Sequence, residues 1–156
     1  MTDNFELDLT SKNITQLGFF FKDVKKHAEK WEDLFGVDKF SYIPAHTIKY
    51  FYRGNYNDVT VIQAFSRCFN TQLEFVQHIE GESYHKEFLD KGREGLHHIS
   101  IFVEDIESYI EKFKSIGIEQ ISGGQRGRQM YAHFDTEKTL GVILELQETK
   151  KKVRKK

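Results

Sequence analysis

A short stretch near the start of the chain is repeated in its second half, and this repeat constrains the fold more than any other feature. Residues 16–24 match residues 98–106 position for position, with a constant offset of 82. In both copies apolar residues alternate with residues of the opposite face, which predicts a strand, and an aspartate (Asp23 or Asp105) then precedes an apolar pattern of helical spacing. A later segment is also duplicated, Leu73-Glu74-Phe75 and Leu144-Glu145-Leu146. The chain is therefore predicted to contain two copies of one unit.

The rest of the pattern predicts the same order of elements in each copy, a β-α-β-β-β unit. In the first copy we expect strands at 14–21, 40–43 (broken at Pro44), 47–52, 59–65 and 72–77, with a helix at 24–35 and a turn at 54–58. In the second we expect a strand from 96, a helix at 106–116, a strand near 119–121, and a hairpin of 130–134 and 141–146. The glycine-rich segment 123–128 between them is predicted to be a lid or a hairpin loop. The expected domain is 13–148, with modules 13–78 and 95–148, a linker helix at 82–92, a loose arm at 1–12 and a disordered basic tail at 149–156.

Composition narrows the class of protein. Lys and Arg number 23 and Asp and Glu 24, for a net charge of −1, so no overall field favours nucleic acid or membrane as a partner. The one cysteine, Cys68, excludes an internal disulfide and fits a reducing compartment. No apolar run approaches the roughly 20 residues that cross a bilayer, and no leader pattern is present. We therefore expect a cytoplasmic protein.

The repeat also indicates candidate site residues. Gln16 and His98 occupy equivalent positions on the first strand of each copy, and Glu74 and Glu145 occupy equivalent positions on the last. All four are predicted to face away from the helix-covered side of the sheet. Gln16 could instead bond backbone within a cleft, and the glutamates could simply face water.

These residues carry a resemblance to a known family. The chain resembles the vicinal oxygen chelate (glyoxalase/bleomycin resistance/dioxygenase) superfamily, and within it the methylmalonyl-CoA epimerase and glyoxalase-like branch. The resemblance is strongest at Phe88-Leu89, Gly95-Leu96-His97-His98 and Asp105-Ile106, and Leu144-Glu145-Leu146 resembles the closing strand. It implies an α+β fold in which two βαβββ modules form an open, barrel-like mixed sheet around a central cleft. It also implies a divalent metal (Mn, Co, Ni or Zn) held by Gln16, Glu74, His98 and Glu145, and it favours a homodimer.

The implied chemistry is Lewis-acid catalysis next to a carbonyl, with Glu145 as the catalytic base. The sequence departs from the epimerase pattern in two places: Gln16 replaces a histidine, and no carboxylate occurs near Thr60, where a second base is expected. An amide ligand favours Mn²⁺ or a similar oxygen-tolerant ion over tightly held Zn²⁺. His97 is predicted to be structural, and the other histidines show no usable spacing.

Three functions remain open. The first is a metal-dependent isomerase, epimerase or lyase that stabilises an enolate or enediolate of a small carbonyl or acyl-thioester substrate. The second is a non-catalytic small-molecule binding protein, similar to antibiotic-resistance members of the superfamily, with a metal weakly bound or absent. The third, a ring-cleaving dioxygenase, is disfavoured because only His98 stands at an expected ligand position. The predicted substrate-binding residues are Phe20, Tyr52, Phe102, Arg126 and Arg128.

Overall fold

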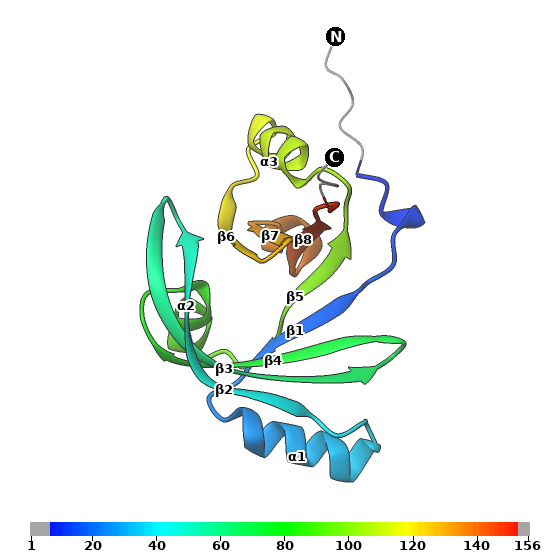
Figure 1. The fold of residues 1–156 in the computed structure, drawn as a ribbon, viewed down its shortest axis with the longest axis vertical. Helices are drawn as coiled ribbons and strands as arrows, with labels where there is room; N and C mark the ends of the chain where they lie inside the picture. Colours follow the sequence, from blue (N-terminus) through cyan, green and yellow to red (C-terminus); the bar gives the residue numbers. More distant parts are fainter. Residues whose placement is uncertain (1–6, 153–156) are drawn as a thin grey trace.

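The computed structural model describes residues 7–152, which form one eight-stranded mixed sheet closed into a barrel. The strand order is β1-β4-β3-β2-β6-β7-β8-β5 (Figure 1). The first unit contains β1 (Gln16–Phe20), α1 (Val24–Phe35), β2 (Ser41–Tyr52), β3 (Asn55–Cys68) and β4 (Thr71–Glu80). The second contains β5 (Gly95–Phe102), α3 (Ile106–Ser115), β6 (Gln120–Arg126), β7 (Gln129–Phe134) and β8 (Ile143–Thr149). Helix α2 (Tyr84–Asp90) joins the units, α4 (Glu137–Leu140) joins β7 to β8, and η1 (Leu9–Ser11) is a short 3₁₀ turn.

The strand register confirms the repeat found in the sequence. Strands β1 and β4 pair in parallel with Gly18 opposite Glu74, and β5 and β8 pair in parallel with Ser100 opposite Glu145. Gly18 and Ser100 are equivalent positions of the repeat, so each glutamate pairs with the same position of the first strand in its own unit. The predicted fold class, two βαβββ units in a barrel-like mixed sheet, is confirmed.

The two units meet at two seams of very different extent. Strands β1 and β5 pair antiparallel over five residue pairs. On the opposite side, β2 and β6 pair only at Phe51–Gly123 and Tyr52–Ser122, and these two pairs close the barrel.

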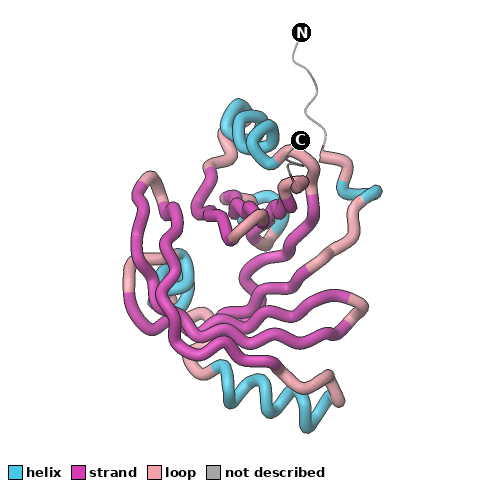
Figure 2. The backbone as a smooth tube through the Cα atoms, in the orientation of Figure 1, coloured by secondary structure: helices cyan, strands magenta, loops and turns pink. Residues whose placement is uncertain are grey.

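Both long helices begin as the aspartates predict. The Asp23 carboxylate accepts a hydrogen bond from the Lys26 amide at 3.0 Å, and Asp105 accepts from the Ser108 amide at 3.1 Å. These bonds satisfy backbone N–H groups that a helix leaves free at its first turn. Figure 2 shows α1 and α3 at opposite ends of the molecule, outside the sheet.

Each helix buries one face against the outer side of its own unit. Helix α1 packs Val24 and Ala28 into a core cluster with Leu73 and Phe75. The corresponding cluster under α3 contains Ile106 and Phe113 with Phe134, Leu144 and Leu146. Full burial of a large apolar side chain contributes about 1.5–3 kcal/mol, so these clusters hold the helices on the sheet. A third cluster, which includes Phe20, Tyr50 and Val76, packs against α2, and polar side chains line much of the remaining cavity.

The first unit departs from the prediction at its hairpin. The strand predicted to break at Pro44 continues as β2, and the pairing with β3 shifts register between Ile43 and His46. A bulge of this kind accommodates a residue that cannot donate a backbone hydrogen bond. The predicted turn at 54–58 is too long, because Arg53 and Gly54, both with positive φ, already form the turn.

The glycine-rich segment 123–128 is a hairpin. Strand β6 runs through it to Arg126, and Gly127, at φ 59°, forms the turn into β7. Of the two alternatives left open for this segment, the structure shows the hairpin.

The predicted arm and tail lie only partly within the described residues. Residues 1–6 and 153–156 lie outside them, while residues 9–11 of the predicted arm form η1. Thr149 is the last residue of β8, and the Lys150 amide donates to the Arg128 carbonyl at 2.9 Å. No helix within residues 7–152 is long and apolar enough to span a membrane.

Candidate metal and acid–base site

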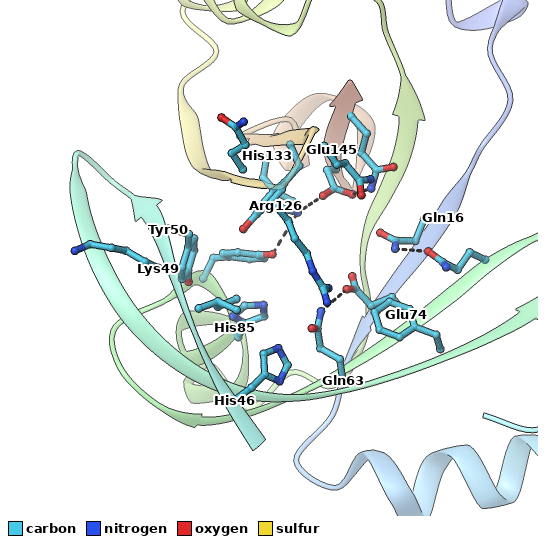
Figure 3. A pocket seen from close by; sticks show the side chains of 18 residues that line it. Gln16, His46, Lys49, Tyr50, Gln63, Glu74, His85, Arg126, His133 and Glu145 are labelled. Carbon is cyan, nitrogen blue, oxygen red and sulfur yellow. Dashed lines mark hydrogen bonds and ion pairs between the residues drawn. The ribbon is translucent and has the colours of Figure 1, made fainter. Parts of the chain in front are cut away.

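The barrel encloses a cavity of about 460 Å³ between the two units (Figure 3). Strands β1, β3 and β4 of the first unit line it together with β6, β7 and β8 of the second, and β2 and α2 complete its wall. Gln16, Glu74 and Glu145 lie on one side of this cavity in Figure 3. The cavity is therefore built from both halves of the repeat.

The four residues predicted from the repeat converge beside this cavity. The Nε2 atom of His98 lies 3.4 Å from Gln16 Oε1, 3.5 Å from Glu74 Oε2 and 3.7 Å from Glu145 Oε2. His98 is almost completely buried, so its imidazole is held in the centre of the group. Each unit contributes one donor from its first strand and one carboxylate from its last.

Gly18 makes room for this arrangement. It pairs with His98 across the β1–β5 seam. A Cβ atom on Gly18 would lie 2.0 Å from His98 Cε1, inside the volume that the imidazole ring occupies. Only glycine at position 18 is compatible with the observed position of the ring.

Hydrogen bonds from neighbouring polar side chains orient the donors. Gln63 Nε2 donates to Glu74 at 2.8 Å, and Gln147 Nε2 donates to Glu145 at 3.0 Å. The Ser100 hydroxyl contacts both Glu145 Oε2 and Gln16 Oε1 and donates to one of them at a time. Gln16 Nε2 in turn donates to the side chain of Gln72, which leaves its carbonyl oxygen directed at His98.

His133 also belongs to the site, although the sequence analysis missed it. Its Nε2 lies 3.5 Å from Glu145 Oε1 and 3.3 Å from the Tyr84 hydroxyl. His98, His133 and Glu145 form a compact buried group whose possible ligand atoms all lie within 4.8 Å of one another. In the register of the sheet His133 is opposite Glu145, as Phe65 is opposite Glu74. Because the equivalent residue is a phenylalanine, the repeat held no signal for this histidine.

Burial controls the charges of the site. Burial and the neighbouring Glu74 raise the pKa of Glu145 to about 7, against the opposing effects of His98 and of the hydrogen bonds from Ser100 and Gln147. Burial opposes protonation of His98, but its hydrogen bond to Glu74 and the charge of Glu145 outweigh burial and raise its pKa. Burial holds the pKa of His133 well below its usual value, so this imidazole is neutral. One carboxyl of the site thus titrates near neutral pH.

The donor set fits a divalent cation. Two ligands of one ion, each bound at about 2.0–2.2 Å, lie roughly 2.8–3.6 Å apart. The 3.4–3.7 Å separations around His98 Nε2 are close to this range. Carboxylate, amide and imidazole donors together suit Mn²⁺, Co²⁺, Ni²⁺ or Zn²⁺.

Comparison with known proteins identifies the family. The model of the Glyoxalase/Bleomycin resistance protein/Dioxygenase superfamily matches residues 15–134. The chain belongs to this superfamily. No curated protein matches it.

Solved structures show the same fold at low sequence identity. A hypothetical protein from Bacillus halodurans is 20% identical, with a TM-score of 0.65 over 93% of this chain and 99% of that chain. Methylmalonyl-CoA epimerase from Mycobacterium tuberculosis is 16% identical, with a TM-score of 0.61 over 88% of each chain. A Streptomyces coelicolor methylmalonyl-CoA epimerase variant in complex with 2-nitronate-propionyl-CoA is 18% identical, with a TM-score of 0.59 over 88% of this chain and 94% of that one. At these identities the likeness shows a shared fold.

Within this superfamily fold, the residues predicted to bind substrate are scattered. Arg126 lines the cavity. Phe20 does not line the cavity: it is fully buried, with its ring 4.6 Å from that of His85 on α2 and stacked on that of His97 at 4.2 Å. Tyr52 lies outside the cavity, where its hydroxyl donates to Glu87 at 2.6 Å. Phe102 is 47% exposed at the end of β5, beyond the cavity.

Arg128 also lies outside the cavity, because it follows the β6–β7 turn and donates to the Lys150 carbonyl at 3.4 Å.

His97, predicted to be structural, has Nδ1 3.2 Å from Nδ1 of His98. If His98 offers Nε2 to a metal, its Nδ1–H donates to His97.

Proposed function

We propose that the protein is a metal-dependent isomerase, epimerase or lyase that moves a proton next to a substrate carbonyl. The observation that carries this proposal is the buried cluster around His98, in which Glu74 and Glu145 approach the imidazole from opposite units. A divalent ion held by Gln16, Glu74, His98 and Glu145, with His133 adjacent, would supply Lewis-acid stabilisation of a developing enolate or enediolate.

Glu145 has the properties of the base. Without a metal, burial raises the pKa of Glu145 to about 7, and a bound divalent cation would lower it, so the ionised carboxylate can accept a proton at neutral pH. Gln147 and Ser100 hold its oxygens, so the carboxylate is positioned before a substrate arrives. Because Glu145 lines the cavity, it can take a proton from one substrate carbon and return it.

The position expected for a second base does not reach the cavity. The Thr60 hydroxyl bonds that of Thr47, and β3 contributes Gln63 and Phe65 to the cavity instead. The carboxylate on the side of the first unit is Glu74. We infer that Glu74 is the second acidic group available to the reacting carbon.

Three variants test the proposal. His98→Ala should sharply reduce bound Mn²⁺, Co²⁺ or Ni²⁺, because it removes the central imidazole. Glu145→Gln should slow exchange of a substrate's α-proton with solvent by about 10²–10⁴-fold, since it keeps an oxygen donor but removes the base. Gln16→His should tighten metal binding. His27→Ala, on α1 outside the site, is the control.

The measurements are metal content, metal affinity and α-proton exchange of the parent and variants. The metal-dependent enzyme would be excluded if the parent bound none of these ions at millimolar concentration and the Gln16→His variant also bound none. The same cavity would then belong to a non-catalytic small-molecule binding protein.

We also propose that the protein is a homodimer. Leu34 and Phe35, adjacent at the end of α1, are each 72% exposed and offer an apolar contact surface to a second copy of the chain. Analytical ultracentrifugation at tens of micromolar should give twice the chain mass of 18.4 kDa. A species of 18.4 kDa alone would contradict the dimer.

A further inference from the structure

The wall of the cavity that faces the carboxylates has a different chemistry from the site described above. Figure 3 shows His46 and His85 on the opposite side of the cavity from Glu145 and Gln16, with Arg126 pointing in from β6. Lys49, also on this wall, is directed away from the cavity in the same view. The cavity thus has a wall of carboxylates and a wall of imidazoles, and the Arg126 side chain extends between them in this view.

His85 is the clearest sign that this wall receives a ligand. It is only 4% exposed, and its buried Nδ1 forms no hydrogen bond to any residue between 7 and 152. Leaving a buried polar group unpaired is unfavourable, and such groups in native proteins usually meet water or a ligand. Its ring lies 4.6 Å from the ring of Phe20, so packing fixes its position.

His46 and Arg126 add two further donors. His46 Nδ1 is 2.9 Å from the Pro44 carbonyl, which assigns the proton to Nδ1, while its buried Nε2 has no partner. Rotation of the ring, which gives up the bond to the Pro44 carbonyl, would direct the N–H into the cavity instead. The Arg126 side chain forms no ion pair or hydrogen bond with the described part of the chain, although eight ion pairs of Lys or Arg side chains occur elsewhere in it. It is therefore a free cation at the mouth of the cavity.

We propose that His46, His85 and Arg126 form an oxyanion-binding subsite for a carboxylate or phosphate group carried by the substrate. The inference rests on the proposed function only in placing the reacting end of that substrate at Glu74 and Glu145. These carboxylates repel an anionic group, whereas Arg126 and the imidazole N–H groups attract it, so the group is oriented toward the imidazole wall. Imidazole N–H groups and a guanidinium are the donors that an oxyanion needs. The substrate class is thus a carbonyl compound with an anionic group at its distal end.

The probes are propionate, its neutral amide propionamide, and inorganic phosphate. Propionate and propionamide have nearly the same size and shape but differ in charge. Each is titrated into the full chain, before and after treatment with EDTA, and binding is followed by NMR of the histidine and backbone signals. We expect at least one of the two anions to bind about tenfold more tightly than propionamide in both preparations. The stronger anion identifies a carboxylate or a phosphate as the natural group.

Matched variants locate the binding. Arg126→Gln should weaken anion binding about tenfold, whereas Arg128→Gln, which removes the same charge from the same hairpin outside the cavity, should not. His85→Phe should also weaken it about tenfold, and His85→Gln should restore part of the affinity, which separates a lost hydrogen bond from a damaged fold.

Two results would overturn the subsite: neither anion binding more tightly than propionamide, or equal losses in Arg126→Gln and Arg128→Gln. His98→Ala separates this proposal from the metal site. Loss of metal with retained anion binding would leave the subsite in place, even if the parent proved to have no metal-dependent activity.

Discussion

At the scale of single residues, Gly18 determines where His98 can lie. A methyl group at position 18 would overlap the imidazole, which is too well packed to move aside cheaply. Gly18→Ala should therefore displace His98 from Gln16, Glu74 and Glu145. We expect metal affinity to fall at least tenfold while far-UV circular dichroism stays that of the parent. Unchanged affinity in a folded Gly18→Ala variant would show that the ring is not a ligand.

Glu145 should make the stability of the metal-free protein depend on pH. In the unfolded chain this carboxyl loses its proton near pH 4.5, whereas the folded protein retains it up to about pH 7. The folded state therefore binds more protons in this window, and the contribution of Glu145 to stability falls as pH rises from about 4.5 to 7. The glutamine side chain of the Glu145→Gln variant cannot ionise, so this variant does not lose stability in this way as pH rises.

The free energy of unfolding of Glu145→Gln, relative to the parent, should accordingly rise between pH 5 and pH 8, by on the order of 3 kcal/mol. Urea unfolding with EDTA present at both pH values measures the difference. Glu148→Gln, on the same strand but only partly buried, is the matched control. A difference that does not change with pH would mean that Glu145 is ionised throughout.

The repeat determined which site residues could be predicted from the sequence. Gln16, Glu74, His98 and Glu145 were predicted because each has an equivalent in the other copy, and strand alternation gave their facing. His133 and His85 have no such equivalent: Phe65 occupies the register of His133, and His85 lies on the linker helix. Phe102 was predicted to bind substrate from the face of the strand on which it lies, and Arg128 from its closeness to Arg126 in the chain. Neither argument predicts where a strand runs past the end of the cavity.

At the scale of elements, the two aspartate caps should act alike because they occupy equivalent positions of the repeat. Asp23→Ala and Asp105→Ala each remove an acceptor from a first-turn amide, and each should lower the free energy of unfolding by about 1 kcal/mol. Asp33→Ala, near the C-terminal end of α1, is the control and should cause no loss, because an acid there opposes the helix dipole. Chemical denaturation of the three variants tests this, and equal effects at all three positions would rule out capping as the cause.

Strand boundaries were less predictable than strand existence. Pro44 was expected to end a strand, but β2 pairs with β6 only at its far end, so Pro44 lies on an edge where no neighbouring strand requires its missing N–H. Asn55 and Asn57 have turn propensity, yet the positive φ of Arg53 and Gly54 completes the turn before them. Both outcomes depend on how the backbone pairs along β2, which local composition does not encode.

At the scale of the whole molecule, a bound ion would link the two units, because each unit supplies two of the four predicted ligands. A ligand that binds only the folded state stabilises it by about 2.7 kcal/mol at 100 times its Kd. For a chain of 156 residues this should raise the unfolding midpoint by roughly 5–10 °C. Thermal unfolding with and without MnCl₂ measures the shift, and His98→Ala should abolish it. An equal shift in His98→Ala would place the ion elsewhere.

The unequal seams of the barrel have a consequence for the time-dependent behaviour of the protein. With two residue pairs at β2–β6 and five at β1–β5, the backbone hydrogen bonds that open first should be those of the shorter seam. Amide deuteration should therefore begin at Phe51, Tyr52, Ser122 and Gly123 and reach β1 and β5 much later. Since β2 and β6 also line the cavity, such openings would exchange the cavity contents with solvent while the donors on β1, β4, β5 and β8 stay in register.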